Sequence, residues 1–198
     1  MRAERRRPVQ IVLSSLKKLL AEFGISTKSW GKGKAKTLAD LLEEIRKGES
    51  QLVVGKNGIV RVVSIVKLHV YDPNYPGRGY LVESRQQLPD GRVRRRRRQP
   101  SEKIKGGEPA KSAAVRGLRE ELRMRGGYVL FRGTLRTENT PNPSYPRLPC
   151  RYIIHKFNVA LEFRSTTLQE EFRITEEDGT VHFFRWKRPK RADIILPL

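Results

Sequence analysis

The segment SEKIKGGEPAKSAAVRGLREELRM, residues 101–124, is the stretch from which the fold can be argued most directly. Its first half is a loop with two adjacent glycines, and its second half has the apolar spacing of a helix over Pro109–Met124. Proline is favoured in the first turn of a helix because its missing N–H would have no partner there. The apolar residues form one stripe, which predicts a helix packed against a core: Ala113, Ala114, Leu118 and Leu122.

Acidic residues are placed around this helix in a way that suits a metal ion. Glu120 and Glu121 are adjacent on the helix, and Glu108 lies in the loop just before it. Arg116 precedes Glu120 by one helical turn, which is the spacing of a side-chain ion pair. Carboxylates hold Mg²⁺ together with the phosphate oxygens of a substrate. The segment is therefore a candidate site for Mg²⁺ and a diphosphate, and a solvated charged helix face is the alternative.

This segment resembles the Nudix box, the loop–helix motif of the Nudix hydrolase family. The family pattern is glycine, five residues, glutamate, seven residues, arginine-glutamate-aliphatic, one residue, glutamate-glutamate, one residue, glycine-aliphatic. The resemblance implies a Nudix-like α/β/α sandwich with a mixed sheet, and hydrolysis of a phosphoanhydride that depends on Mg²⁺ or Mn²⁺. The residues of this chain that match the pattern are Glu108, Arg116, Leu118, Glu120, Glu121 and Met124.

The resemblance also implies a role for each charged residue that matches. Glu120 and Glu121 would hold the metal, and Arg116 would orient the two glutamates. Glu108 would support either the loop or the metal.

Three positions depart from the family pattern. Glu102 stands at the opening glycine, Gly117 at the glutamate that follows the arginine, and Arg123 at the late glycine. The missing glutamate belongs to the metal-binding set in the family, so its loss is expected to lower a metal-assisted activity sharply. Gly117 also costs roughly 1 kcal/mol of helix stability relative to alanine. The carboxylates considered as substitutes for the missing one are Glu138, Glu170, Glu171, Glu176 and Glu177.

A run of five arginines comes shortly before the box, on the second strand of a hairpin that turns at Asp90-Gly91. Alternate strand residues face opposite sides, so both faces of this strand are charged, which indicates an edge strand or a protruding hairpin. Guanidinium groups match phosphate geometry, and the run is a candidate phosphate or nucleic-acid site. Charge that protects a sheet edge from aggregation is the alternative. The five residues are Arg94, Arg95, Arg96, Arg97 and Arg98.

The amino-acid composition and net charge indicate which kinds of partner the chain would bind. The chain of 198 residues has 42 Lys and Arg against 21 Asp and Glu, a net charge of +21, which favours a polyanion such as a nucleotide, RNA or DNA. No apolar run is long enough to span a membrane. Cys150 is the single cysteine, which excludes an intrachain disulfide and a cysteine-based zinc cluster, and a reducing, cytoplasmic compartment is expected.

Along the chain, we expect an N-terminal helical pair over 1–49 and a Nudix-like domain of the α/β or α+β class over 50–198. Gly24 ends the first helix, Thr37 caps the second, and an apolar tail, Ala192–Leu198, docks on the body. The expected helices are Val9–Phe23, Leu38–Lys47 and Pro109–Met124, and the expected strands are Gln51–Val54, Ile59–Tyr71, Tyr80–Leu88, Arg92–Arg98, Tyr128–Leu135, Arg151–Phe163 and Val181–Lys187.

Three functions are compatible with these features. The leading hypothesis is Mg²⁺-dependent hydrolysis of a nucleoside-diphosphate-linked compound or an RNA 5′ end, with activity weakened or lost through Gly117. The alternative is a non-catalytic Nudix-fold module that binds RNA, DNA or a ribonucleoprotein partner, which both Gly117 and the net charge favour. A protein-interaction scaffold is the third.

Overall fold

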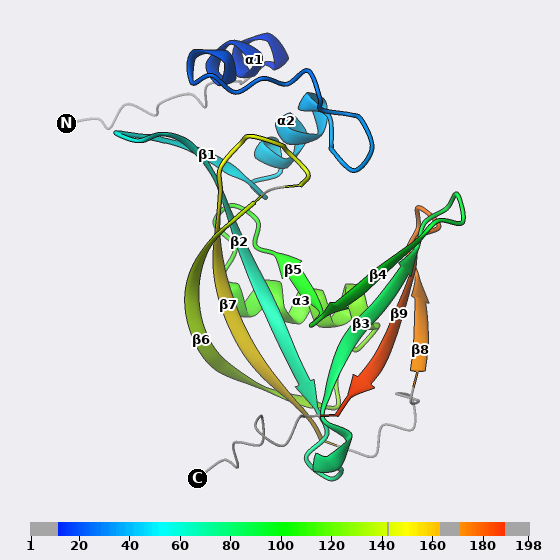
Figure 1. Cartoon of the computed structure of the whole chain (residues 1–198). Helices are drawn as coiled ribbons and strands as arrows, with labels where there is room; N and C mark the ends of the chain where they lie inside the picture. The colour runs from blue at the N-terminus through cyan, green and yellow to red at the C-terminus, as the bar shows by residue number, and fades with distance from the viewer. Residues whose placement is uncertain (1–11, 142, 163–170, 189–198) are drawn as a thin grey trace, which may run out of the picture. The chain divides into compact units, whose positions relative to one another are not determined.

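The computed structural model describes residues 12–141, 143–162 and 171–188 (Figure 1). This part of the chain is an α+β fold with three α-helices and a nine-stranded mixed sheet. The helices are α1 (Leu13–Glu22), α2 (Leu38–Arg46) and α3 (Ala110–Leu122), and a short 3-10 helix covers Pro76–Arg78. The strands are β1 (Gln51–Gly55), β2 (Gly58–Tyr71), β3 (Tyr80–Gln87), β4 (Val93–Arg98), β5 (Ser101–Lys103), β6 (Tyr128–Thr140), β7 (Cys150–Leu161), β8 (Glu171–Thr175) and β9 (Val181–Lys187).

The sheet runs in the order β6-β7-β2-β3-β9-β8 and opens between β2 and β3. These two strands pair at Tyr71 and Tyr80 and then diverge, as Figure 1 shows. Further along, β2 pairs with β5 and β3 pairs with β4. The opening therefore places the short β5 beside one strand and the arginine-rich β4 beside the other.

The chain forms two compact units. Unit 1 comprises the described parts of Met1–Val63 and Thr137–Tyr152, and unit 2 comprises those of Ser64–Arg136 and Ile153–Leu198. The long strands β2, β6 and β7 each contribute residues to both units. The boundary expected at Glu49 falls inside unit 1, which also takes in β1 and the start of β2.

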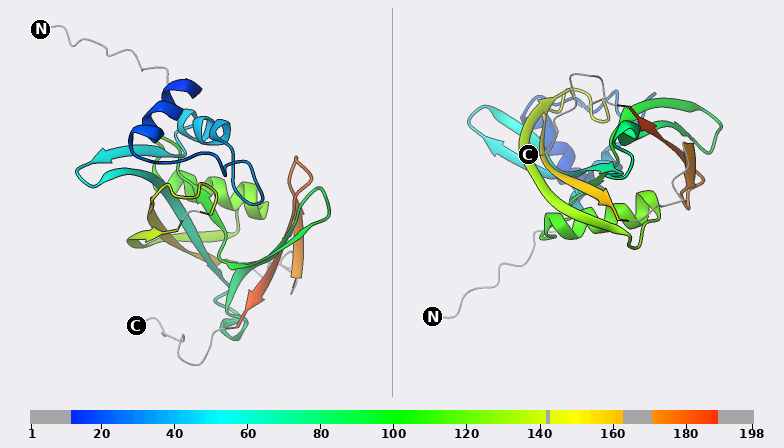
Figure 2. Two further views of the ribbon diagram at one scale, coloured as in Figure 1. Left: turned by 45° about the horizontal axis from the view of Figure 1, so that its top comes forward. Right: turned by 90° about the horizontal axis from the view of Figure 1, so that it is seen from below.

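The core of unit 2 is built from the apolar stripe of α3 and the inward residues of the strands. Both views in Figure 2 show α3 along one side of these strands. Ala113, Ala114 and Leu118 are fully buried, as the periodicity of the segment predicts. The residues that complete this core include Val66, Leu68 and Val70 of β2, Leu81 of β3, Phe157, Val159 and Leu161 of β7, and Phe184 and Trp186 of β9. The functional side chains described below are held on this core.

Unit 1 has a separate core and a buried ion pair. Thr37 caps α2 as predicted, and Asp40 completes a capping box with it. Arg61 of β2 and Glu44 of α2 are both buried, and their N–O distance is 2.6 Å. The apolar residues of this core include Leu16, Leu20, Trp30, Leu41, Ile59, Tyr145 and Leu148.

The ends of several elements differ from the expectation. Helix α3 ends at Leu122 and not at Met124, because Arg123 adopts a left-handed conformation (φ 55°). The N–H of Met124 then bonds the carbonyl of Leu118, which satisfies a carbonyl at the helix end. Strand β6 continues to Thr140, beyond its expected end at Leu135. The tail Ala192–Leu198, Glu170 and the first residues of the predicted N-terminal helix lie outside the described residues.

No helix in the described part of the chain is both long and apolar enough to cross a membrane.

Candidate metal and phosphate site

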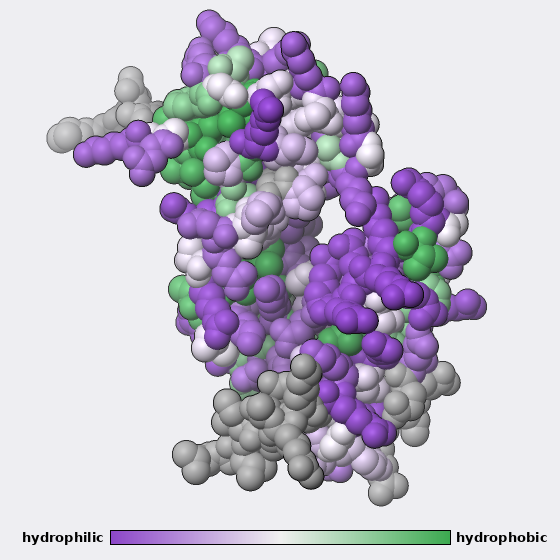
Figure 3. Space-filling view, in the orientation of Figure 1, coloured by the Kyte–Doolittle hydropathy of each residue, from purple (hydrophilic) through white to green (hydrophobic). Residues whose placement is uncertain are grey.

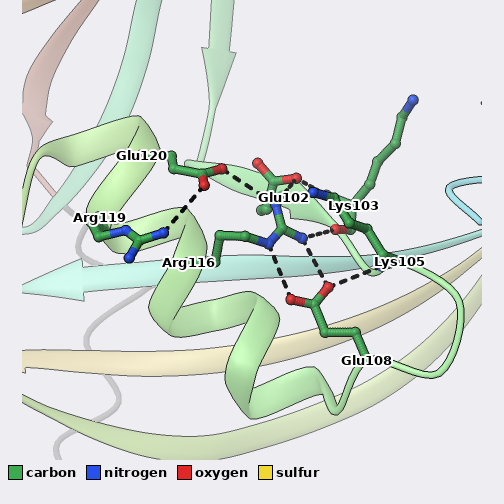
Figure 4. Close-up of polar contacts among 7 residues, drawn as sticks. All are labelled: Glu102, Lys103, Lys105, Glu108, Arg116, Arg119 and Glu120. Atoms are coloured by element: carbon green, nitrogen blue, oxygen red, sulfur yellow. Dashed lines mark hydrogen bonds and ion pairs between the residues drawn. The ribbon is translucent and has the colours of Figure 1, made fainter. Parts of the chain in front are cut away.

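Residues four apart lie on the same face of a helix, so α3 presents two neighbouring columns of two residues each. Arg116 and Glu120 form the first column, and Gly117 and Glu121 form the second. The first column faces the loop before the helix (Figure 4). The second approaches His182 of β9, whose imidazole lies near the Glu121 carboxylate.

The first column is organised by Arg116, whose side chain is only 14% exposed. Its Nε and Nη2 donate to Glu108, over 3.1 and 2.9 Å, and its Nη2 also donates to the carbonyl of Lys103 over 2.7 Å. Its Nη1 lies 2.8 Å from Glu102 and 3.4 Å from Glu120 (Figure 4). One guanidinium thus joins β5, the loop and α3.

Both carboxylate oxygens of Glu108 accept hydrogen bonds within this group of residues. Each oxygen accepts from Arg116, and Oε2 also accepts from the backbone N–H of Lys105 over 3.0 Å. The hydrogen bonds from Arg116 are the main reason that the pKa of Glu108 is lowered, and bonding to Glu108 in turn raises the pKa of Arg116. This geometry corresponds to support of the loop, one of the two roles that the family resemblance implies for Glu108.

The second column leads to a group of three potential metal ligands. Glu121 of α3, Glu176 and His182 each offer a ligand atom, and these atoms lie within 4.8 Å of one another. The pKa of Glu121 is raised to about 7, mainly because burial disfavours its charge; His182 lowers this pKa, and the neighbouring carboxylates of Glu102, Glu176 and Glu83 contribute to raising it. A carboxylate that is desolvated beside other carboxylates is a typical candidate for a functional site.

His182 points an unsatisfied nitrogen into this group. The residue is 6% exposed, and its buried Nε2 has no hydrogen-bond partner among the described residues. Nε2 lies 3.1 Å from Glu176 Oε1, but without the geometry of a hydrogen bond. The negative charge of Glu176 also raises the pKa of His182.

Glu83 of β3 fixes the other nitrogen of His182. Its Oε1 lies 2.9 Å from Nδ1, and because a carboxylate can only accept, the proton on Nδ1 points to Glu83. Metal-binding histidines are commonly oriented in this way by a carboxylate on the second nitrogen. Bonding to Glu83 raises the pKa of His182. Burial alone would raise the pKa of Glu83, but hydrogen bonds with His182 and Arg98 lower it.

The arginine run lies beside this group. Strand β4 pairs with β3 alone among the described strands, as the charge on both of its faces predicts. Arg98 Nε donates to Glu83 Oε2 over 2.7 Å, and Arg96 Nε donates to Gln86 over 2.9 Å. The remaining three arginines, Arg94, Arg95 and Arg97, are exposed. Figure 3 shows that hydrophilic side chains dominate the visible surface where β3 and β4 lie in Figure 1.

The donors of Glu121, Glu176 and His182 fit a divalent cation. Two carboxylates suit Mg²⁺ and Mn²⁺, whereas an imidazole suits Mn²⁺ and later transition ions better than Mg²⁺. The buried and unsatisfied Nε2 of His182 supports this fit, since a buried polar atom without a partner is destabilising unless something binds it.

The structure thus brings together some of the residues singled out in the sequence and separates others. Glu121 and Glu176 meet at the candidate site. Glu120 is half-exposed in the first column, beside Arg116 and Arg119 (Figure 4).

Three further residues, Glu83, Glu102 and His182, were not expected at the site. Glu83 is the one that the sequence could have indicated, because it stands two residues after Leu81 in the expected strand and therefore shares a face with an apolar residue. The position of His182 depends on the pairing of β3 with β9, which the local sequence does not specify.

No family model matches the chain, and no curated protein matches it.

Proposed function

We propose that the chain is a Nudix-like hydrolase that depends on Mg²⁺ or Mn²⁺ and cleaves a phosphoanhydride, in a nucleoside-diphosphate-linked compound or at an RNA 5′ end. The α+β fold, with α3 packed on the sheet of unit 2, is compatible with a Nudix-like α/β/α sandwich. The single observation that carries the proposal is the group of Glu121, Glu176 and His182, whose imidazole is bonded to Glu83, the carboxylate that also binds Arg98 of β4.

Each part of this arrangement has a distinct task. Glu121, Glu176 and His182 would hold the cation, and Glu83 keeps the imidazole in the required tautomer. When bound, such a cation polarises a phosphate oxygen and lowers the pKa of a water molecule. Exposed guanidinium groups on β4 bind the phosphates of the substrate.

The proposal is tested by measuring Mn²⁺ binding and phosphate release on the full chain. We expect wild type to bind Mn²⁺ and to release phosphate from nucleoside-diphosphate-linked compounds or from triphosphate-ended RNA. Glu121→Gln should weaken both, because it removes one charged ligand from the group. Glu43→Gln is the matched control, since Glu43 is a half-exposed carboxylate of α2 in unit 1. Absence of turnover on every substrate class with either metal would overturn the catalytic proposal.

A second candidate function is a non-catalytic module that binds RNA or DNA. Gly117 removes a carboxylate from the box, and three exposed arginines on β4 add to a net charge of +21. Contacts of this kind are to the phosphate backbone and do not depend on nucleotide sequence.

A further inference from the structure

The strands β4, β3, β9 and β8 lie side by side in unit 2, and their two faces differ in character (Figure 1). Directly opposed residues of antiparallel strands share a face, so the pairing registers assign each side chain to one of them. The inner face carries Leu81, Phe184 and Trp186 of the core, together with Glu83 and His182. The candidate metal group, to which His182 belongs, is therefore on the inner face.

The outer face of these four strands is strongly basic. The registers place six cationic side chains on it, and Glu171 is the one carboxylate among the paired residues of this face. Such an excess of positive charge attracts polyanions, and it releases counterions from a nucleic acid that binds to it. The six residues are Arg85 of β3, Arg95 and Arg97 of β4, Arg173 of β8, and Arg185 and Lys187 of β9.

Four of the six cations are exposed arginines that form no ion pair with another described residue. Arg85 differs from them, since its Nη1 lies 2.6 Å from a carboxylate oxygen of Glu171. Neighbouring strands are about 4.8 Å apart, so guanidinium groups on several strands can contact phosphates of one bound chain. The four arginines are Arg95, Arg97, Arg173 and Arg185.

Two aromatic rings lie among these cations. Arg85 Cζ is 3.8 Å from the centre of the Phe183 ring, and Lys187 Nζ is 5.4 Å from the centre of the Tyr80 ring. Both rings are partly exposed. Unpaired bases stack on aromatic rings and on guanidinium planes, whereas the bases of a duplex are already stacked on each other. The outer face therefore favours a single strand over a duplex.

An anionic membrane surface is the other polyanion that such charge could attract. Segments that bind a membrane surface bury apolar side chains in it in addition to their basic residues. Among the exposed large apolar side chains of the described residues, Val93 of β4 is the one on the outer face. The outer face therefore suits a nucleic acid better than a lipid surface.

We propose that the outer face of β4, β3, β9 and β8 binds single-stranded nucleic acid, with its arginines on the phosphates and the rings of Phe183 and Tyr80 near the bases. This inference rests on the second candidate function, nucleic-acid binding, and assigns that function to one face. It does not depend on cleavage, because His182 and its metal group lie on the inner face. Strand β4 contributes to both faces, since Arg94 lies opposite Gln86 on the inner one.

The first test measures binding of short oligouridine RNA and oligothymidine DNA to the full chain by fluorescence anisotropy, with EDTA present and over a range of salt concentrations. We expect wild type to bind, and the tighter strand identifies the ligand as RNA or DNA. Replacing Arg95, Arg173 and Arg185 by glutamine should lower the slope of log K against log salt by about 2, or roughly 0.7 for each lost phosphate contact. The matched control replaces three exposed cations of unit 2 outside this face, Lys111, Arg125 and Arg132, and should keep the slope of wild type.

A second pair of variants tests base stacking. Phe183→Leu removes the ring next to Arg85, so it should weaken binding about tenfold and leave the salt slope unchanged, because stacking releases no counterions. Phe131→Leu is its matched control, since Phe131 is an exposed ring of β6. The Tm of each variant, measured without nucleic acid, separates a loss of binding from a loss of folding.

The outcomes separate this inference from the functions proposed above. An equal fall in slope for both triple variants would overturn the role of the outer face and leave nucleic-acid binding in place. Equal affinity for a duplex, or unchanged affinity of Phe183→Leu, would overturn the preference for a single strand. If wild type binds neither strand but binds phosphatidylserine vesicles, the inference and the second candidate function both fail. Loss of Mn²⁺ binding in the Arg95, Arg173 and Arg185 variant would contradict the independence of the two faces.

Discussion

Glu121 shows at the residue scale how a fold changes the chemistry of one side chain. Its pKa is raised from 4.5 to about 7 because burial disfavours its charge. A group whose pKa is higher in the folded than in the unfolded chain stabilises the fold when it is protonated. This stability is fully present below about pH 4.5 and is lost as the pH rises through about 7.

We therefore predict that the metal-free protein loses stability between about pH 4.5 and pH 7, and that Glu121→Gln flattens this profile because glutamine resembles the protonated carboxyl. The measurement is the free energy of unfolding in urea at several pH values with a chelator present. The raised pKa of His182 acts in the same direction, so the informative quantity is the difference between wild type and the variant. Parallel profiles for the two proteins would show that Glu121 keeps an ordinary pKa.

At the scale of elements, the helices and strands with a regular apolar spacing or a clear turn signal could be predicted from the sequence. The stripe of α3, the cap of α2 and the hairpin turn before β4 all follow from local spacing and turn residues. Strand β5 could not be predicted, because its three residues are too few to show an alternating pattern. The position of His182 depends on the register Gln86↔His182, which joins residues far apart in sequence. The spacing of apolar residues predicts where a helix or strand lies, but it does not predict which strand pairs with it.

Strand β4 leads to a prediction about nucleic-acid binding. Replacing the exposed Arg94, Arg95 and Arg97 by glutamine should lower the slope of log K against log salt for single-stranded RNA by about 2, or roughly 0.7 for each phosphate that is no longer neutralised. Arg96 and Arg98 are left in place because they hold Gln86 and Glu83. The measurement is fluorescence anisotropy over a range of salt concentrations.

The charge-matched control for this prediction replaces three exposed lysines of unit 1, Lys17, Lys18 and Lys28, by glutamine. An equal fall in slope for both triple variants would mean that net charge, and not the arginine strand, determines binding.

At the scale of the whole molecule, the N-terminal helices belong to a core that also contains distant residues. Ile59, Tyr145 and Leu148 are each at most 3% exposed and pack in the same cluster as residues of α1 and α2. The core of unit 2 contains no residue from the described part of 1–49. Removal of the helices should therefore affect the two units differently.

We predict that a chain of residues 50–198 loses the packing of Thr137–Tyr152 but keeps the core around α3. Burial of an aliphatic side chain contributes about 1.5–3 kcal/mol, so exposing Ile59 and Leu148 together removes about 3–6 kcal/mol of packing from the core that includes this segment. Hydrogen exchange, compared between full chain and truncation, should show faster exchange at Thr137–Tyr152 and unchanged protection in α3. Unchanged protection at Thr137–Tyr152 would show that the helices are a separable addition.

The contact between Gly117 and Glu102 also restricts how the chain can change over evolutionary time. A Cβ added at Gly117 would lie 2.9 Å from Glu102 Cβ, so a larger residue at Gly117 requires a smaller one in place of Glu102. Substitutions at the two positions are therefore coupled, and their effects on stability are not additive.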